Sequence, residues 1–143
     1  MEVTERADEV TVVNDAYNAN PDSVRAALRA LADMEVAGRR VAVLGGMLEL
    51  GDAAAEQHRS IGAAAADLGV DVVVGVGDLA RDVVAGFEAG GGEAYWVGDT
   101  DAAHEQLESM LRPGDTVLLK SSRDAGLRWL GDRLSGIGEG LTR

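Results

Sequence analysis

Residues 41–76 read VAVLGGMLELGDAAAEQHRSIGAAAADLGVDVVVGV. An apolar run at 41–44 comes first, and a glycine-containing loop follows it. Residues 54–68 are rich in alanine and have a helical pattern that ends at Gly69, and a second apolar run fills 72–76. Both runs are continuous rather than alternating in polarity. We therefore expect two parallel strands that are covered on both faces and joined by a helix.

The same alternation of strand and helix recurs along the chain. Further strands are expected at 10–14, 94–97 and 116–119, and residues 1–6 can pair with the first of these through a turn at 7–9. Helices are expected at 21–34 with Asn20 as N-cap, at 79–89, at 100–111 with Asp99 or Thr100 as cap, and at 122–134.

Short connections and right-handed crossovers then predict an α/β fold. We expect an open, mostly parallel, Rossmann-like sheet with helices on both faces, built as a single domain over residues 1–134. The glycine-rich residues 135–143 are expected to form a flexible tail.

The composition excludes several classes of function. The chain has no Cys, which excludes a disulfide scaffold, a thiolate metal site and a cysteine nucleophile. Its formal net charge of −12 argues against a nucleic-acid partner. Residues 1–10 lack the apolar core of a signal peptide, and the most apolar window, 61–80, is interrupted by three Asp. We expect a cytoplasmic protein with no membrane partner.

In open parallel sheets, ligands bind outside the carboxyl ends of the strands, so the residues that follow each strand are the first candidates. The first such loop begins with Asp15 at the end of a strand and contains Asn18 and Asn20 before a helix. An ionised carboxylate there suits the two hydroxyls of a ribose. The alternative is an Asx-rich turn in which Asn20 only caps the helix, and residue types alone favour that alternative.

The last loop holds the one lysine of the chain, Lys120, followed by Ser121, Ser122 and Arg123. Two cations, two hydroxyls and the start of a helix make an anion site. The alternative is that Lys120 pairs with a nearby carboxylate, but the grouping favours the anion site.

The loop at 45–51 combines glycines with apolar side chains. Gly45 and Gly46 permit a ligand to approach the backbone closely. The apolar residues Met47, Leu48 and Leu50 contact another domain or a substrate, or they fold back onto the sheet, and both interpretations stay open. His58, on the following helix, could face the cleft, although it could also be solvated or cap a helix.

Residues 75–80 match the G-x-G-x-x-A pattern of dinucleotide-binding loops, and Asp99 lies 22 residues after Gly77. A free-standing module that binds NAD or a similar dinucleotide is therefore an alternative function. We favour a plain tight turn, because the match is short and Asp78 would place negative charge beside a pyrophosphate. No G-x-x-x-x-G-K-[ST] phosphate loop and no metal-ligand pattern occurs in the sequence.

Four segments together resemble the C-terminal domain of the Mur ligases: DAYNANPDS at 15–23, LGGMLELG at 44–51, His58, and KSSR at 120–123. The string YNANP at 17–21 is most similar to the members that add D-Ala-D-Ala to UDP-N-acetylmuramoyl (UDP-MurNAc)-tripeptide in peptidoglycan synthesis. It speaks against a related ligase of the folylpolyglutamate or cyanophycin type. Three positions depart from the family pattern, since the family commonly has an acidic residue in place of Gly46, Asp in place of Asn14, and Gly or Ala in place of Ser121.

The resemblance implies an ATP-dependent, ADP-forming ligase in which an acyl phosphate of the tripeptide is attacked by the amine of D-Ala-D-Ala. It implies N-terminal and central domains of the same enzyme as partners, with ATP and Mg²⁺ held mainly by the central domain. This domain would close over the nucleotide and the amine substrate, would hold no catalytic residue and no metal, and would be inactive alone.

The resemblance also implies roles for individual residues. Asp15 would accept the ribose hydroxyls, and the nucleotide side would be lined by Tyr17, Asn18 and Asn20. The incoming dipeptide would face Glu49, Lys120, Ser121, Ser122 and Arg123. A possible cleft would include Gly45, Gly46 and His58.

Overall fold

The computed structural model describes residues 2–15, 19–48, 50–120 and 127–135. Within these ranges, six strands form one sheet in the order β1-β2-β6-β3-β4-β5. The strands are β1 (Glu2–Glu5), β2 (Thr11–Asn14), β3 (Arg40–Leu44), β4 (Val72–Val76), β5 (Glu93–Val97) and β6 (Thr116–Lys120). The pair β1–β2 is antiparallel, and every other neighbouring pair is parallel.

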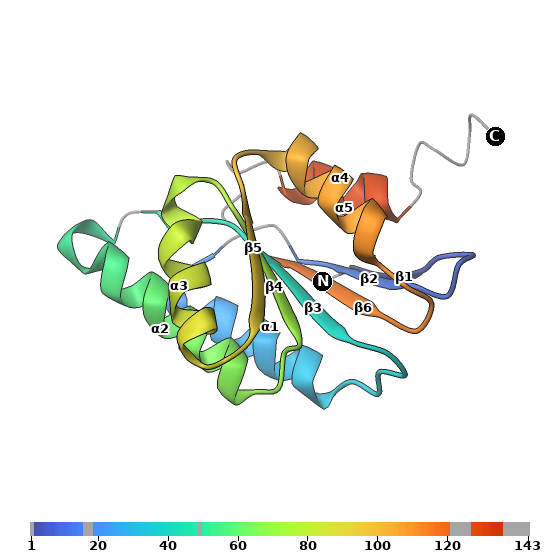
Figure 1. Ribbon diagram of the computed structural model, residues 1–143, viewed down its shortest axis with the longest axis horizontal. Coiled ribbons are helices and arrows are strands. Elements are labelled where there is room, and N and C mark those ends of the chain that lie inside the picture. Colours follow the sequence, from blue (N-terminus) through green and yellow to red (C-terminus); the bar gives the residue numbers. More distant parts are fainter. Residues whose placement is uncertain (1, 16–18, 49, 121–126, 136–143) are drawn as a thin grey trace.

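Helices cover both faces of this sheet (Figure 1). The first face packs against α1 (Pro21–Asp33), α2 (Ala54–Asp67) and α3 (Arg81–Ala89). The second packs against α4 (Thr100–Met110) and α5 (Leu127–Leu134). The expected α/β fold, with its mostly parallel sheet between helices, is confirmed. No helix in the described part of the chain is long and apolar enough to cross a bilayer.

Local sequence explains where two helices begin. The side-chain oxygen of Asn20 accepts a hydrogen bond from the Ser23 N–H at 2.8 Å, and Pro21 occupies the first turn, where no N–H is needed. At α4, the side chain of Asp99 accepts from the Ala102 N–H at 2.8 Å, so Asp99 rather than Thr100 is the cap.

Several elements differ from the sequence-based expectation. The helix expected at 79–89 begins with a 3-10 turn, η2 (Asp78–Ala80), and becomes α-helical at Arg81. A second turn, η1 (Gly51–Ala53), precedes α2 and was not expected. For the helix expected at 122–134, residues 122–126 lie outside the described part. The domain boundary at 134 and the flexible tail stay predictions.

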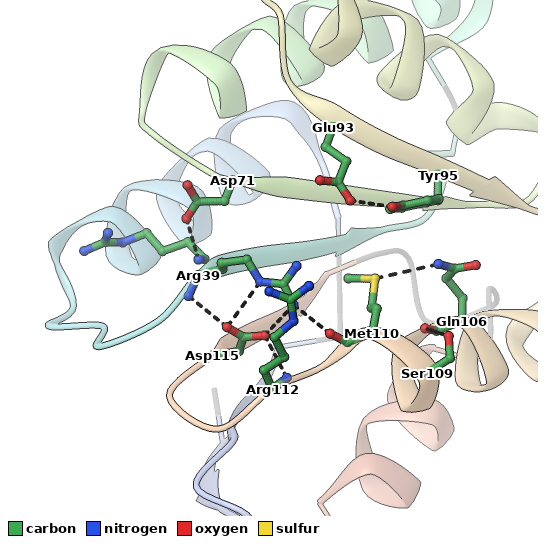
Figure 2. A network of polar contacts seen from close by, with 10 residues as sticks. Arg39, Asp71, Glu93, Tyr95, Gln106, Ser109, Met110, Arg112 and Asp115 are labelled. Carbon is green, nitrogen blue, oxygen red and sulfur yellow. Dashed lines mark hydrogen bonds and ion pairs between the residues drawn. The ribbon is translucent and has the colours of Figure 1, made fainter.

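The amino ends of β3 and β6 are joined by an ion pair between Arg39 and the buried Asp115 (Figure 2). Asp115 is 2% exposed and accepts from the Arg39 guanidinium at 2.8 Å and from the backbone N–H groups of Arg39 and Arg112, each at 2.9 Å. Burial by itself raises the pKa of Asp115, but the hydrogen bonds and the charge of Arg39 outweigh it and hold that pKa below its usual value.

Two consecutive arginines at this end also bind the ends of helices on opposite faces. Arg39 donates to the carbonyl of Met110, the last residue of α4, at 2.6 Å (Figure 2). Arg40 donates to the carbonyls of Leu31 at 3.1 Å and Met34 at 2.6 Å, at the end of α1. Because successive residues of a strand point to opposite faces, one dipeptide satisfies carbonyl groups in both helix layers.

Candidate functional site

The carboxyl ends of β2, β6 and β3 meet at one edge of the sheet, which we call the rim. The Asp15 N–H donates to the Leu119 carbonyl at 3.0 Å, and the Gly45 N–H donates to the Lys120 carbonyl at 3.1 Å. These bonds continue the parallel ladders past the strand ends. They place Asp15, Lys120 and Gly45 side by side, with Lys120 in the middle.

The connections at this rim leave in different directions. The chain runs from β2 to α1 and from β3 to α2 on one face, whereas α5, the described helix that follows β6, lies on the other face (Figure 1). A crevice opens where neighbouring strands send their connections to opposite faces, and this is the usual place for a ligand in such sheets. The end of β6 occupies this position.

Lys120 and Asp15 form an ion pair in the rim. Their Nζ and Oδ2 atoms are 3.2 Å apart, and the side chains are 6% and 18% exposed. The sequence left open whether Lys120 forms an anion site or pairs with a carboxylate. In the structure Lys120 pairs with Asp15. The residue expected to bind the amine substrate, Lys120, is therefore in direct contact with the residue expected to bind the nucleotide, Asp15.

His58, on α2, is buried rather than solvated. The residue is only 1% exposed. Its Nε2 accepts from the Met47 N–H at 2.9 Å, and its Nδ1 lies 2.6 Å from the Ala54 carbonyl oxygen. Since a carbonyl only accepts, Nδ1 carries the hydrogen. Both ring nitrogens are bound to backbone, which the helical position of His58 in the sequence did not reveal.

Some apolar residues of the 45–51 loop fold back onto the sheet, and one is exposed and available for contact with another domain or a substrate. Met47 is buried in the core that contacts α1 and α2, and Leu50 packs against that core. Leu48 is 45% exposed. Gly46 is buried, and a Cβ built on it would lie 2.6 Å from the Cβ of Leu79, so this close packing excludes the acidic residue common in the family unless Leu79 moves.

Of the other predicted site residues, only Asn20 lies in the described part of the chain. The side-chain oxygen of Asn20 caps α1. The remaining predicted residues lie outside the described part of the chain: Tyr17, Asn18, Glu49, Ser121, Ser122 and Arg123. Among the residues that are described, no group of three or more His, Asp or Glu side chains has a geometry that could hold a metal ion.

In the dinucleotide-like loop, one glycine is needed for close packing and another for its backbone conformation. A Cβ on Gly75 would lie 2.6 Å from Val84 Cγ2, and Gly77 has a φ of +89°, which favours glycine. Asp99 caps α4 instead of projecting toward a ribose. These contacts support the tight-turn interpretation. Sequence reasoning missed a contact beside this loop, in which the Arg81 guanidinium lies 3.7 Å from the ring centre of the half-buried Trp96.

Sequence reasoning also gave little weight to Asn14, the last residue of β2, which connects the strand next to the rim with α5. Asn14 is buried, and its Nδ2 donates to Asp132 Oδ1 in α5 at 3.3 Å. A Cβ on Gly131 would lie 2.4 Å from the Asn14 amide, so a glycine is needed for α5 to approach β2. Asn14 and Gly131 are more than 100 residues apart in the sequence. Their contact therefore has no local sequence signal.

The family model described as "Mur ligase, glutamate ligase domain" matches residues 1–123. The chain belongs to this Mur ligase family. The resemblance found in the sequence is confirmed, and the rim of this Mur ligase domain is formed by residues of the motifs that carried it.

Curated relatives of this Mur ligase domain share one name. The UDP-N-acetylmuramoyl-tripeptide–D-alanyl-D-alanine ligase of Mycobacterium tuberculosis (strain CDC 1551 / Oshkosh) is 46% identical over 94% of this chain and 30% of its own length. The ligase of the same name from Mycobacterium leprae (strain TN) is 42% identical over 100% of this chain and 31% of its own length. The chain therefore spans about a third of the length of these relatives.

Solved structures have the same fold. A crystal structure of MurF from Acinetobacter baumannii superposes with a TM-score of 0.82 at 28% identity, over 94% of this chain and 30% of that one. The structure of MurF ligase from Thermotoga maritima in complex with ADP superposes with a TM-score of 0.76 over 97% of this chain and 31% of that one. At 24% identity, the second likeness concerns the fold alone.

Proposed function

We propose that this domain is part of an ADP-forming ligase that adds D-Ala-D-Ala to UDP-MurNAc-tripeptide in peptidoglycan synthesis. The observation that carries the proposal is the 46% identity, over 94% of this chain, with a relative bearing that name. The partners would be the N-terminal and central domains of the same enzyme. ATP and Mg²⁺ would be held mainly by the central domain, since the sequence here contains no phosphate loop.

The proposed reaction has two steps. The tripeptide carboxylate attacks the γ-phosphorus of ATP, which forms an acyl phosphate and releases ADP. The amine of D-Ala-D-Ala then attacks the acyl carbon, which forms the amide bond and releases phosphate and a proton. This chain contributes binding and orientation to both steps, so we propose that it is inactive alone.

The ion pair at the rim suits this role. An ammonium group carries three N–H donors, and a carboxylate accepts several hydrogen bonds. The Lys120–Asp15 pair, 3.2 Å apart, could therefore accept ribose hydroxyls on its Asp15 side and donate to the dipeptide carboxylate on its Lys120 side. Tyr17, Asn18 and Asn20 would line the nucleotide, and Glu49, Ser121, Ser122 and Arg123 the dipeptide. We propose these roles from the family resemblance, with the geometry of Asp15 and Lys120 in support.

A chimaeric enzyme tests the proposal. The matching segment of the Mycobacterium tuberculosis ligase, to which this chain is 46% identical, is replaced by this chain. We expect phosphate release that requires ATP, UDP-MurNAc-tripeptide and D-Ala-D-Ala together, whereas this chain by itself should release none. The unmodified ligase is the control for assay conditions. Turnover by the isolated chain, or a well-folded chimaera without D-Ala-D-Ala-dependent turnover, would contradict the proposal.

A further inference from the structure

The buried imidazole of His58 lies where the 45–51 loop joins α2, and nothing in the proposed reaction uses it. Its two nitrogens contact two backbone groups, the Met47 N–H at 2.9 Å and the Ala54 carbonyl at 2.6 Å. Ala54 is the first residue of α2, and Met47 is in the loop. The ring therefore connects the loop to the start of the helix.

This connection fixes the part of the loop that the strands do not hold. Gly45 is bound to the end of β6 through the Lys120 carbonyl at 3.1 Å. Two residues later, the buried Met47 N–H has the imidazole as its acceptor. A buried N–H that loses its acceptor is costly, so removal of Nε2 favours a rearranged loop. Met47 would then leave the core against which Leu50 packs.

We propose that His58 is a positioning residue for the amine substrate, acting through residues 45–48, which follow β3, on the Lys120 side of the rim. This inference rests on the proposed function. β3 borders β6 on the side away from β2, so the loop that follows β3 lies across Lys120 from Asp15. A change in the loop should therefore alter binding of the dipeptide more than binding of the nucleotide.

Two variants separate the two contacts of the ring. In His58→Gln, the side-chain oxygen can occupy the place of Nε2 and accept from Met47. In His58→Asn, the side-chain amide can occupy the place of Nδ1 and donate to Ala54, but no acceptor reaches Met47. The two substitutions are similar in polarity, so each is the control for the other.

Steady-state kinetics of the chimaeric ligase give the functional test. We expect His58→Asn to raise the KM for D-Ala-D-Ala about tenfold, with the KM for ATP changed less than about twofold. His58→Gln should restore most of the difference. Equal effects of the two variants, an unchanged KM for D-Ala-D-Ala, or an equal rise in the KM for ATP would overturn the positioning role.

An NMR measurement on the unmodified chain needs no activity and no variant. Long-range ¹H–¹⁵N spectra should show His58 as the Nδ1–H tautomer, and the Met47 amide should exchange with solvent more slowly than the Leu48 amide. An Nε2–H tautomer or a rapidly exchanging Met47 amide would overturn the inference even if the ligase is active. An inactive chimaera with a protected Met47 amide would instead contradict the proposed function, and with it the substrate role of His58.

Discussion

Each end of the central strand β6 has an ion pair, and the two pairs are built differently. At the amino end, Asp115 has its oxygens bound by the Arg39 guanidinium and by two backbone N–H groups. At the carboxyl end, Lys120 Nζ lies 3.2 Å from Asp15 Oδ2, and the Asp15 side chain is 18% exposed. The first arrangement holds a buried carboxylate between strand ends, whereas the second lies partly exposed at the rim, where a ligand can reach it.

The largest effect should follow from breaking the amino-end pair. Arg39→Met leaves the Asp115 carboxylate buried without its cation, and we expect the free energy of unfolding to fall by about 3 kcal/mol. Urea unfolding followed by circular dichroism measures this. The matched control is Arg59→Met, whose 3.5 Å pair with Asp82 has side chains 55% and 39% exposed, so the loss there should be below about 0.5 kcal/mol. Similar losses of unfolding free energy in both variants would show that the Arg39–Asp115 pair stabilises the fold no more than an exposed surface pair does.

The carboxyl-end pair should matter for activity more than for stability. We expect Asp15→Asn/Lys120→Met to change the free energy of unfolding by less than about 1 kcal/mol, because both charges are removed together. In the chimaeric ligase, the same double variant should lower kcat/KM about 100-fold. A double variant that is fully active, or that is as unstable as Arg39→Met, would remove the distinction between the two ends.

A smaller effect is expected beside the rim, where Gly46 contacts Leu79. A Cβ on Gly46 would lie 2.6 Å from the Cβ of Leu79, so Gly46→Ala should lower the free energy of unfolding by about 1 kcal/mol. The loss should be smaller in a Leu79→Gly background, which removes every Leu79 atom near Gly46. A thermal unfolding series over the four proteins gives the coupling, and strict additivity would show that the two residues do not interact.

The smallest effect should appear only in acid. Because the pKa of Asp115 is lowered in the folded chain, its contribution to stability is present above the ordinary value of about 3.9 and is lost as pH falls through the lower folded value. Below about pH 4, wild-type stability should therefore decline more steeply than that of Asp115→Asn. Urea titrations from pH 6 to pH 2.5 measure both curves, and parallel curves would show that Asp115 titrates normally.

The sequence predicts the sheet and the rim because their signals are local. A continuous apolar run such as 72–76 is bounded by polar residues and glycine, and β4 has those bounds. The cap at Asn20 likewise depends on residues next to it in the chain. Once the strands are parallel, the residues after them must share an edge, so the shared position of Asp15 and Lys120 at the rim follows from the strand pattern.

The remainder depends on contacts between distant segments. Nothing near Lys120 indicates that its partner is Asp15 rather than a ligand, because β2 and β6 are neighbours only in the folded sheet. The helical spacing of His58 does not show that an N–H from the preceding loop points at its ring. Met47 is buried and Leu48 is 45% exposed although the two side chains are similarly hydrophobic, so residue type does not predict which of them faces the core.

The arginines at residues 39 and 40 connect α4 and α1 to the same strand at the edge opposite the rim. These contacts help to set the spacing of the three layers at the end of the sheet away from the rim. Loops at the rim can then change in length or composition while the helices keep their distance from the sheet. For recombination between members of this family, the structure indicates that exchange points should lie in the rim loops and that the 34–40 segment should be kept with its own helices.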